Sequence, residues 1–230
     1  MKGEFFMYTI EIQKVGNPKV NNNGYSTVGY ANVDYNGIFT LRYMAIVQKP
    51  DGSLFVACPN YLTSKKDKDG KAISNSIYNP ITAEFREELF SNVLAAFDSN
   101  VREFVCEENI DVPTEYGVRV TPYTQENSKL SGFASVYLDD RIVVSGIRLY
   151  DGQNGLMVQM PCFKTSKYDK DGNPKYKPYC FSQSADFREE LNNTIKQEME
   201  EQIKEQQKDQ QQTQQQEKQQ GGKFKRAVKR

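Results

Sequence analysis

The pentapeptide Phe85-Arg86-Glu87-Glu88-Leu89 returns as Phe187-Arg188-Glu189-Glu190-Leu191, a shift of 102 residues from position 85 to position 187. Pro59 and Pro161, and Gly70 and Gly172, repeat with the same spacing. Nearer the N-terminus the spacing is 103, for Gly29 and Gly132 and for Val33 and Val136. The repeat predicts two copies of one small domain, with one residue inserted near Asp151 to Gly155. Because domains this small bury little surface alone, we expect the copies to pack together as a pseudo-dimer.

The predicted elements follow the same order in both copies. Runs rich in β-branched and aromatic residues alternate with turn signals such as Asn36-Gly37, whose place Asp139-Asp140 takes in the second copy, and this pattern is typical of antiparallel hairpins. In the first copy, the predicted strands are Met7 to Val15, Tyr25 to Tyr35, Ile38 to Gln48 and Leu54 to Cys58. A lysine-rich loop, a last strand and a helix follow.

Each predicted helix begins after a residue type that caps helix N-termini, Thr82 for the first and Ser184 for the second. Their side-chain oxygens can accept hydrogen bonds from N–H groups of the first turn. Apolar residues recur at helical spacing, and the broader stripe of the first helix predicts its deeper burial. Residues 206–220 contain no apolar side chain, which predicts a frayed, solvated helix or disorder, ended by Gly221-Gly222.

These patterns place the chain in the α+β class, as two tandem units of a small antiparallel sheet and a helix, with a helical or disordered C-terminal tail. The predicted division is a first unit at residues 1–107, an acidic linker at 108–117, a second unit at 118–205, and a Gln-rich tract with a basic tail at 206–230.

Composition argues against several classes of function. The 230 residues include four cysteines and no histidine, so the commonest general base is absent, and the scattered cysteines favour neither a zinc site nor a disulfide framework. No apolar run approaches the roughly 20 residues that span a bilayer. We therefore expect a cytoplasmic protein with no membrane contact, no cofactor, no metal ion and no small-molecule substrate.

Three motifs follow one another in the second copy: Phe133-Ala134-Ser135-Val136, a valine-rich run from Ile142 to Leu149, and Asn154-Gly155-Leu156-Met157-Val158-Gln159-Met160-Pro161. A lysine-rich loop and a serine-capped helix come next. This order resembles the SpoVG family (stage V sporulation protein G, septation protein). The first copy resembles the family more faintly, through Leu54-Phe55-Val56-Ala57-Cys58-Pro59.

The resemblance implies a small antiparallel sheet with a helix that dimerises through its strands. It also implies a bacterial, cytoplasmic regulator, connected with septation and sporulation, that binds DNA or RNA and is not an enzyme. A tandem fusion would place both halves of the dimer in one chain. Arg86 and Arg188 keep the arginine of the family's helix start, whereas Glu88 and Glu190 stand where the family has a basic residue.

The lysine-rich loops and the C-terminal basic arm are the candidates for nucleic-acid contact, because clustered cations neutralise phosphates and neighbouring tyrosines can stack on bases. Lysines on a hairpin tip also protect strand edges from aggregation, and a basic tail also aids solubility, so both interpretations stay open. The candidate nucleic-acid-binding residues are Lys164, Lys167, Lys170, Lys175, Lys177, Arg188, Arg86, Lys65, Lys66, Lys68, Lys71, Lys223, Lys225, Arg226, Lys229 and Arg230.

Two acidic patterns are better explained by local structure than by chemistry. Asp67-x-Asp69-Gly70 and Asp169-x-Asp171-Gly172 are similar to calcium loops but lack the further ligands and the terminal glutamate, and turn formation explains them. The pairs Asp139-Asp140 and Glu189-Glu190 are chain neighbours that do not converge on one substrate, so we expect no catalytic residue.

The sequence therefore predicts a non-catalytic nucleic-acid-binding regulatory protein, as a monomeric pseudo-dimer or a higher oligomer. The alternative is a protein–protein interaction or assembly module whose acidic helix starts and Gln-rich tail bind protein partners. Charge placement separates the two hypotheses. If the second lysine-rich loop and the basic arm share one face they form a single phosphate-binding surface, and if they lie apart the interaction module gains support.

Overall fold

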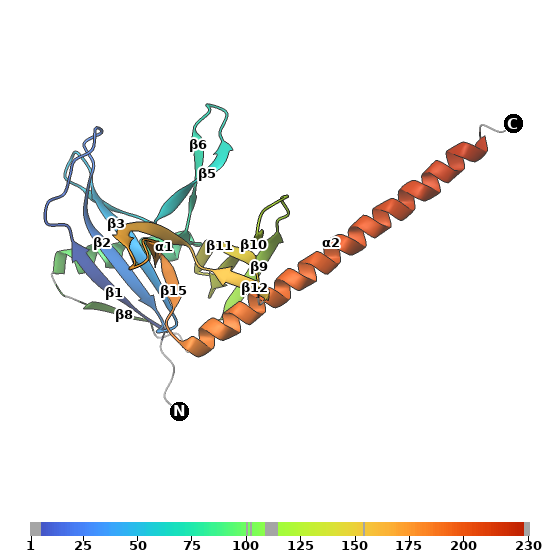
Figure 1. Ribbon diagram of the computed structural model, residues 1–230. Coiled ribbons are helices and arrows are strands. Elements are labelled where there is room, and N and C mark those ends of the chain that lie inside the picture. The colour runs from blue at the N-terminus through green and yellow to red at the C-terminus, as the bar shows by residue number, and fades with distance from the viewer. Residues whose placement is uncertain (1–5, 100, 102, 109–114, 154, 228–230) are drawn as a thin grey trace.

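The structure, a computed structural model, describes residues 6–99, 101, 103–108, 115–153 and 155–227, with the backbone alone for 6, 7, 64, 107, 108 and 209–227. The first unit contains β1 (Phe6–Lys14), β2 (Ser26–Tyr35), β3 (Phe39–Gln48), β4 (Leu54–Ala57), β5 (Asn60–Lys66), β6 (Ala72–Ser76), β7 (Tyr78–Pro80), α1 (Ala83–Ser99) and β8 (Glu103–Glu108). The second unit contains β9 (Tyr116–Pro122), β10 (Leu130–Leu138), β11 (Ile142–Gly152), β12 (Gly155–Gln159), β13 (Cys162–Tyr168), β14 (Pro174–Pro178), β15 (Cys180–Ser182) and α2 (Ala185–Ala227). Figure 1 shows both units.

The predicted duplication is confirmed, because β9 to β15 and α2 repeat the order of β1 to β7 and α1. The first large sheet has the order β15-β3-β2-β1-β8, with β4 also on β3, and the second has the order β12-β11-β10-β9, with β7 also on β11. The β5–β6 and β13–β14 hairpins form two separate two-stranded sheets. Strand β8, which caps the β1 edge, comes between the two repeats.

The two units exchange their last strands. Strand β7 of the first unit pairs with β11 of the second, with Asn79 opposite Val143, and β15 of the second unit pairs with β3 of the first, with Phe181 opposite Thr40. Each helix then returns to its own unit, where α1 packs on β1 and β4 and α2 packs on β9 and β12. The expected pseudo-dimer is therefore built by reciprocal strand exchange.

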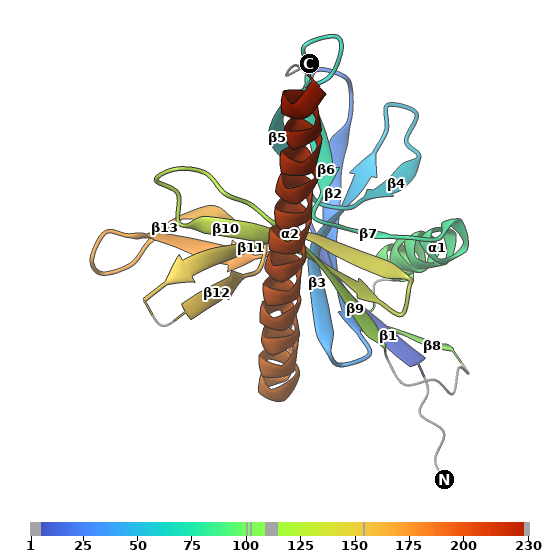
Figure 2. The ribbon, with the colours of Figure 1, turned by 90° about the vertical axis from the view of Figure 1, so that its right-hand side faces the viewer.

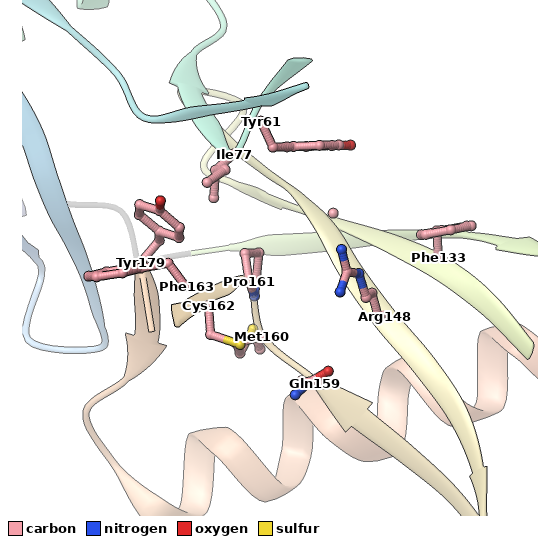
Figure 3. A pocket seen from close by; sticks show the side chains of 11 residues that line it. Tyr61, Ile77, Phe133, Arg148, Gln159, Met160, Pro161, Cys162, Phe163 and Tyr179 are labelled. Atoms are coloured by element: carbon pink, nitrogen blue, oxygen red, sulfur yellow. The ribbon is translucent and has the colours of Figure 1, made fainter. Parts of the chain in front are cut away.

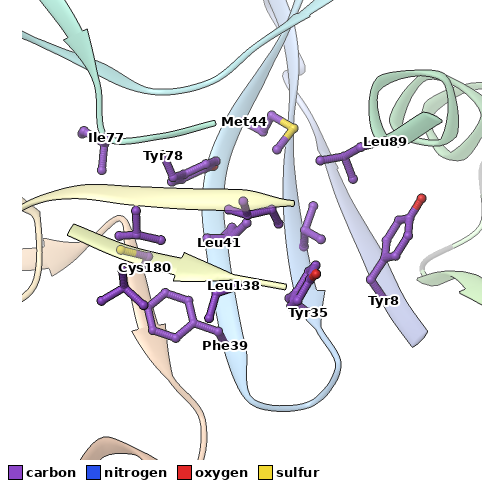
Figure 4. Packing of buried hydrophobic residues seen from close by; sticks show 14 of the residues in the cluster. Tyr8, Tyr35, Phe39, Leu41, Met44, Ile77, Tyr78, Leu89, Leu138 and Cys180 are labelled. Carbon is purple, nitrogen blue, oxygen red and sulfur yellow. The ribbon is translucent and has the colours of Figure 1, made fainter. Parts of the chain in front are cut away.

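One hydrophobic core runs through both units, and its middle lies between the exchanged strands (Figure 4). Tyr78 of β7 is fully buried, and its hydroxyl donates a hydrogen bond of 2.7 Å to the carbonyl of Arg42. Its counterpart in the repeat, Cys180, is also fully buried. A large side chain from one unit and a small one from the other therefore share the core where the units meet.

Backbone geometry at equivalent positions fixes the register of the repeat. Asn36, Gly37, Asp139 and Asp140 have φ angles of 51°, 67°, 48° and 51°, and positive φ at both central residues defines the type I′ turn of a two-residue hairpin. Further along, the ladders of β2–β3 and of β10–β11 shift register between Ala31 and Val33 and between Ala134 and Val136. The same irregularity therefore occurs in both units.

The helix starts were correctly predicted. The hydroxyl of Thr82 accepts a hydrogen bond of 3.2 Å from the N–H of Phe85, and that of Ser184 accepts one of 2.9 Å from the N–H of Phe187. The predicted end of the second helix was wrong, because α2 continues through Gly221-Gly222 to Ala227. Glycine costs only about 1 kcal/mol relative to alanine in a helix interior, and here the pair does not end the helix.

Glu88 and Glu190 have matching structural roles in the two units. The hydroxyl of Tyr8 on β1 donates a hydrogen bond of 2.8 Å to Glu88 on α1, and that of Tyr116 on β9 donates one of 2.8 Å to Glu190 on α2. These bonds tie each helix to the first strand of its unit. They explain why a glutamate recurs at this point of the helix.

Candidate nucleic-acid interface

The β13–β14 hairpin presents lysines next to exposed tyrosines. Lys164 and Tyr176 stand directly opposite each other in register, so their side chains share one face of the hairpin. The ammonium of Lys164 lies 5.6 Å from the ring centroid of Tyr168, and the Tyr168 and Tyr176 side chains are each 57% exposed. The other predicted lysines of this hairpin are also exposed, and they are Lys167, Lys170, Lys175 and Lys177.

The aspartates at the tip of the hairpin are engaged in forming the turn. The Asp169 carboxylate accepts hydrogen bonds from the N–H groups of Asp171 and Asn173, at 2.9 and 2.8 Å. The bond from Asn173 is the main cause that lowers the pKa of Asp169. Asp67 accepts the same two bonds in the first unit. The predicted turn chemistry therefore accounts for both Asp-Gly motifs.

The equivalent β5–β6 hairpin also carries lysines, but it has no tyrosine at the place of Tyr176. Leu62, which stands in the place of Lys164, is opposite Ser74 and is 72% exposed. Lys66 occupies the place of Tyr168. The predicted lysines of this hairpin are all exposed, and they are Lys65, Lys66, Lys68 and Lys71. Only the second hairpin combines a lysine and two tyrosines on these matched positions.

The two predicted arginines have different surroundings. The guanidinium of Arg86 donates a hydrogen bond of 3.2 Å to the carbonyl of Pro80, which connects α1 to the exchanged strand β7. Arg188 is exposed in the first turn of α2. Arg86 thus has a structural contact, whereas Arg188 faces solvent.

The backbone at the C-terminal end of α2 lies away from the β13–β14 hairpin. Lys223, Lys225 and Arg226 belong to the last turns of α2, whose side chains are outside the described part of the structure, and Lys229 and Arg230 lie outside the described residues altogether. In Figure 1 the end of α2 projects far beyond both sheets, and in Figure 2 β13 extends to a different side of the molecule. The described backbone therefore places the end of α2 apart from the hairpin lysines.

A small pocket that the sequence did not reveal lies where the units meet (Figure 3). It has a volume of 160 Å³, and residues of both units line it. We call it the seam pocket. Its principal residues are Tyr61, Gly146, Arg148, Gln159, Pro161, Cys162 and Phe163. These residues belong to β5, β11, β12, β13 and the β12–β13 connection. No local motif could have predicted it, because the strand exchange brings these segments together.

The cysteines are poorly suited to nucleophilic chemistry. Burial raises the pKa of Cys58 and of Cys180 to about 12, so both thiols stay protonated near neutral pH. Burial also raises the pKa of Cys162, and the neighbouring Arg148 guanidinium opposes that rise. Cys58, Cys162 and Cys180 form no disulfide.

No group of three or more Cys, Asp or Glu side chains among the described residues is placed to hold a metal ion. No described helix is long and apolar enough to cross a membrane.

The fold and this surface define a tandem, strand-exchanged α+β protein. The sequence profile of the SpoVG family matches residues 9–99 and 114–201, and the chain belongs to this family. The family is not a known family of enzymes.

Several curated relatives carry the name septation protein SpoVG. The relative from Symbiobacterium thermophilum is 32% identical over 103 residues, which is 43% of this chain and 67% of the relative. The relative from a Thermoanaerobacter species is 33% identical over 83 residues, 36% of this chain and 83% of the relative. The relative from Treponema denticola is 33% identical over 75 residues, 33% of this chain and 73% of the relative. No solved structure gave a significant match.

Proposed function

We propose that the protein is a non-catalytic, nucleic-acid-binding regulator that contacts DNA or RNA mainly through the β13–β14 hairpin. The observation that carries this proposal is the face on which Lys164 lies beside Tyr168 and opposite Tyr176. Cations give sequence-independent affinity for phosphates, and exposed rings can stack on unpaired bases. Because the curated relatives are named for septation, we place the regulation in septation or sporulation in the bacterial cytoplasm.

Salt dependence tests the proposal. Fluorescence anisotropy would measure binding of single- and double-stranded DNA and RNA by the full chain at a series of salt concentrations. Replacing the five hairpin lysines by alanine should weaken binding and should lower the log–log salt slope by about 0.7 for each single-strand phosphate that the protein no longer neutralises. These substitutions are Lys164→Ala, Lys167→Ala, Lys170→Ala, Lys175→Ala and Lys177→Ala.

The first unit supplies the matched control. Alanine at Lys65, Lys66, Lys68 and Lys71 removes a similar amount of charge from the equivalent hairpin, which lacks the lysine and tyrosine pair. This variant should lose less affinity than the second-unit variant. The proposal fails if the wild type shows no binding at low salt, or if neither variant changes binding.

A protein-interaction or assembly module is the second candidate function. The observation that favours it is the separation of the C-terminal end of α2 from the β13–β14 hairpin (Figures 1 and 2), because a helix that projects from the sheets is available to another protein. Light scattering of the full chain and of a chain ending at residue 205 would test it. Self-association that disappears on truncation, together with no nucleic-acid binding at low salt, would make this the better account.

A further inference from the structure

The seam pocket has a counterpart on the first-unit side, and the two differ in their polar walls. Arg148 and Gln159 stand directly opposite each other on β11 and β12, so their side chains lie on one face. The equivalent pair on β3 and β4 is Ala45 and Ala57. The second unit therefore places a guanidinium and an amide where the first unit has two methyl groups.

The two pockets also differ where the β2–β3 and β10–β11 ladders shift register. Gly146 has a φ of 74°, and a Cβ added there would lie 3.4 Å from Cε1 of Tyr61, so the glycine lets the Tyr61 ring lie directly over the backbone. At the equivalent place Tyr43 has a φ of 65°, and its ring packs edge-on against Phe163 with centroids 5.2 Å apart. The first unit therefore has a ring at this position, whereas the second unit has no side chain there.

The size of the seam pocket suits one planar ring. Its volume is 160 Å³, and a cavity of roughly 150 Å³ is large enough to hold benzene. The hollow on the first-unit side is much broader, at 790 Å³, and the Lys14 ammonium at its rim lies 4.6 Å from the ring centroid of Phe97. Of these two hollows, only the seam pocket has both a volume that fits one ring and two polar side chains that stand directly opposite each other on paired strands.

The charge and position of the pocket indicate which kind of ligand would carry a ring into it. Arg148 and Gln159 are both exposed, no carboxylate lines the pocket, and among the described residues none forms an ion pair with Arg148. Phe163 of the pocket wall stands directly opposite Lys177 of the hairpin, so their side chains share one face. A polyanion that follows the hairpin lysines would therefore reach the pocket mouth at Arg148.

We propose that the seam pocket receives one unstacked base of a single-stranded nucleic acid. Tyr61 stacks on the base, and Arg148 and Gln159 donate hydrogen bonds to the adjoining phosphate or to the base edge. Figure 3 shows Tyr61 across the pocket from Pro161, with Arg148 beside them. This proposal rests on the nucleic-acid-binding function, and it adds a defined pocket for one base to the lysine and tyrosine face of the β13–β14 hairpin.

The test compares oligothymidine with an abasic oligonucleotide of the same length, which has the same phosphates. The full-length wild type should bind oligothymidine at least about fivefold more tightly, as expected for one stacked base. Tyr61→Ala, and Arg148→Ala combined with Gln159→Ala, should each lower this ratio about fivefold, because the stacking on Tyr168 and Tyr176 is left in place. The second of these variants recreates the alanine pair of the first unit, so the fold already tolerates it.

Gln13→Ala combined with Lys14→Ala is the matched control, because it removes one amide and one cation from the rim of the first-unit hollow. It should leave the ratio unchanged. Equal wild-type affinity for both oligonucleotides would overturn the base pocket while leaving the proposed function intact. No binding of either oligonucleotide at low salt would overturn both.

Discussion

Tyr43 and Gly146 hold the same place in two copies of one unit, yet they give their surroundings different properties. Tyr43 adopts a φ of 65°, a conformation that is uncommon for a residue with a side chain. Gly146 adopts it without strain and leaves open a pocket beside Arg148. In a dimer of identical chains both positions would carry the same residue. A tandem chain can therefore carry different residues, and hollows of different size, on the two sides of its pseudo-dimer.

The same asymmetry occurs in the core. Tyr78 and Cys180 are equivalent by the 102-residue shift from position 78 to position 180, and both are fully buried on the exchanged strands. Two tyrosines would overfill this part of the core, whereas two small side chains would leave a cavity. The unequal pair fills the space because the two copies are free to diverge.

The largest expected effect comes from breaking this unequal pair. Tyr78→Ala removes a fully buried ring and its hydrogen bond to the Arg42 carbonyl, and it should lower the free energy of unfolding by about 3–5 kcal/mol. Cys180→Ala removes a single sulfur atom and should cost about 1 kcal/mol. Urea denaturation measures both changes. Equal losses for the two variants would contradict the unequal packing of the core.

A smaller effect is expected at the bonds that tie each helix to its first strand. Tyr8 is fully buried, and its hydroxyl both donates to Glu88 and accepts a hydrogen bond of 2.6 Å from the amide of Asn92. Tyr8→Phe should cost about 1–3 kcal/mol, because buried polar groups lose a partner.

The equivalent change in the second unit should be milder. The bond from Tyr116 to Glu190 is exposed, so water can replace it, and Tyr116→Phe should cost less than about 1 kcal/mol. Thermal or urea unfolding of the two variants side by side would check the order. A larger loss for the Tyr116 variant would show that the second unit depends more on this bond than its burial indicates.

The smallest effect should come from the C-terminal extension of α2. Among the side chains of this helix that the structure describes, those of Leu191, Ile195 and Met199 are buried, all before residue 206. Removing residues 206–230 should therefore change the melting temperature by less than about 4 °C. A larger drop would show that the tail contributes to the folded core.

The repeat, the hairpin turns and the helix starts could be predicted from sequence because each depends on residues close together in the chain. Thr82 and Ser184 each cap a helix by accepting a hydrogen bond from the N–H three residues further along the chain. Asn36-Gly37 closes a local turn. The strand exchange could not be predicted, since β7 and β15 are three residues long and their partners lie far along the chain.

The candidate site was predictable in part for the same reason. The lysines and tyrosines of the β13–β14 hairpin are contiguous in sequence, so their clustering was visible. The seam pocket was not, because Tyr61 reaches Gly146 only after the two units interlock. The separation of the C-terminal end of the α2 backbone from the hairpin likewise follows from the direction of α2.

Replacing the β13–β14 hairpin by a second copy of the β5–β6 hairpin tests whether the second unit carries the nucleic-acid interface. Residues 61–75 and 163–177 are equivalent segments of equal length, so the first can replace the second without an insertion. The resulting chain should keep its fold by circular dichroism and should lose most of its affinity for single-stranded oligonucleotides in anisotropy measurements. An exchanged chain that folds and binds as tightly as the wild type would contradict the account.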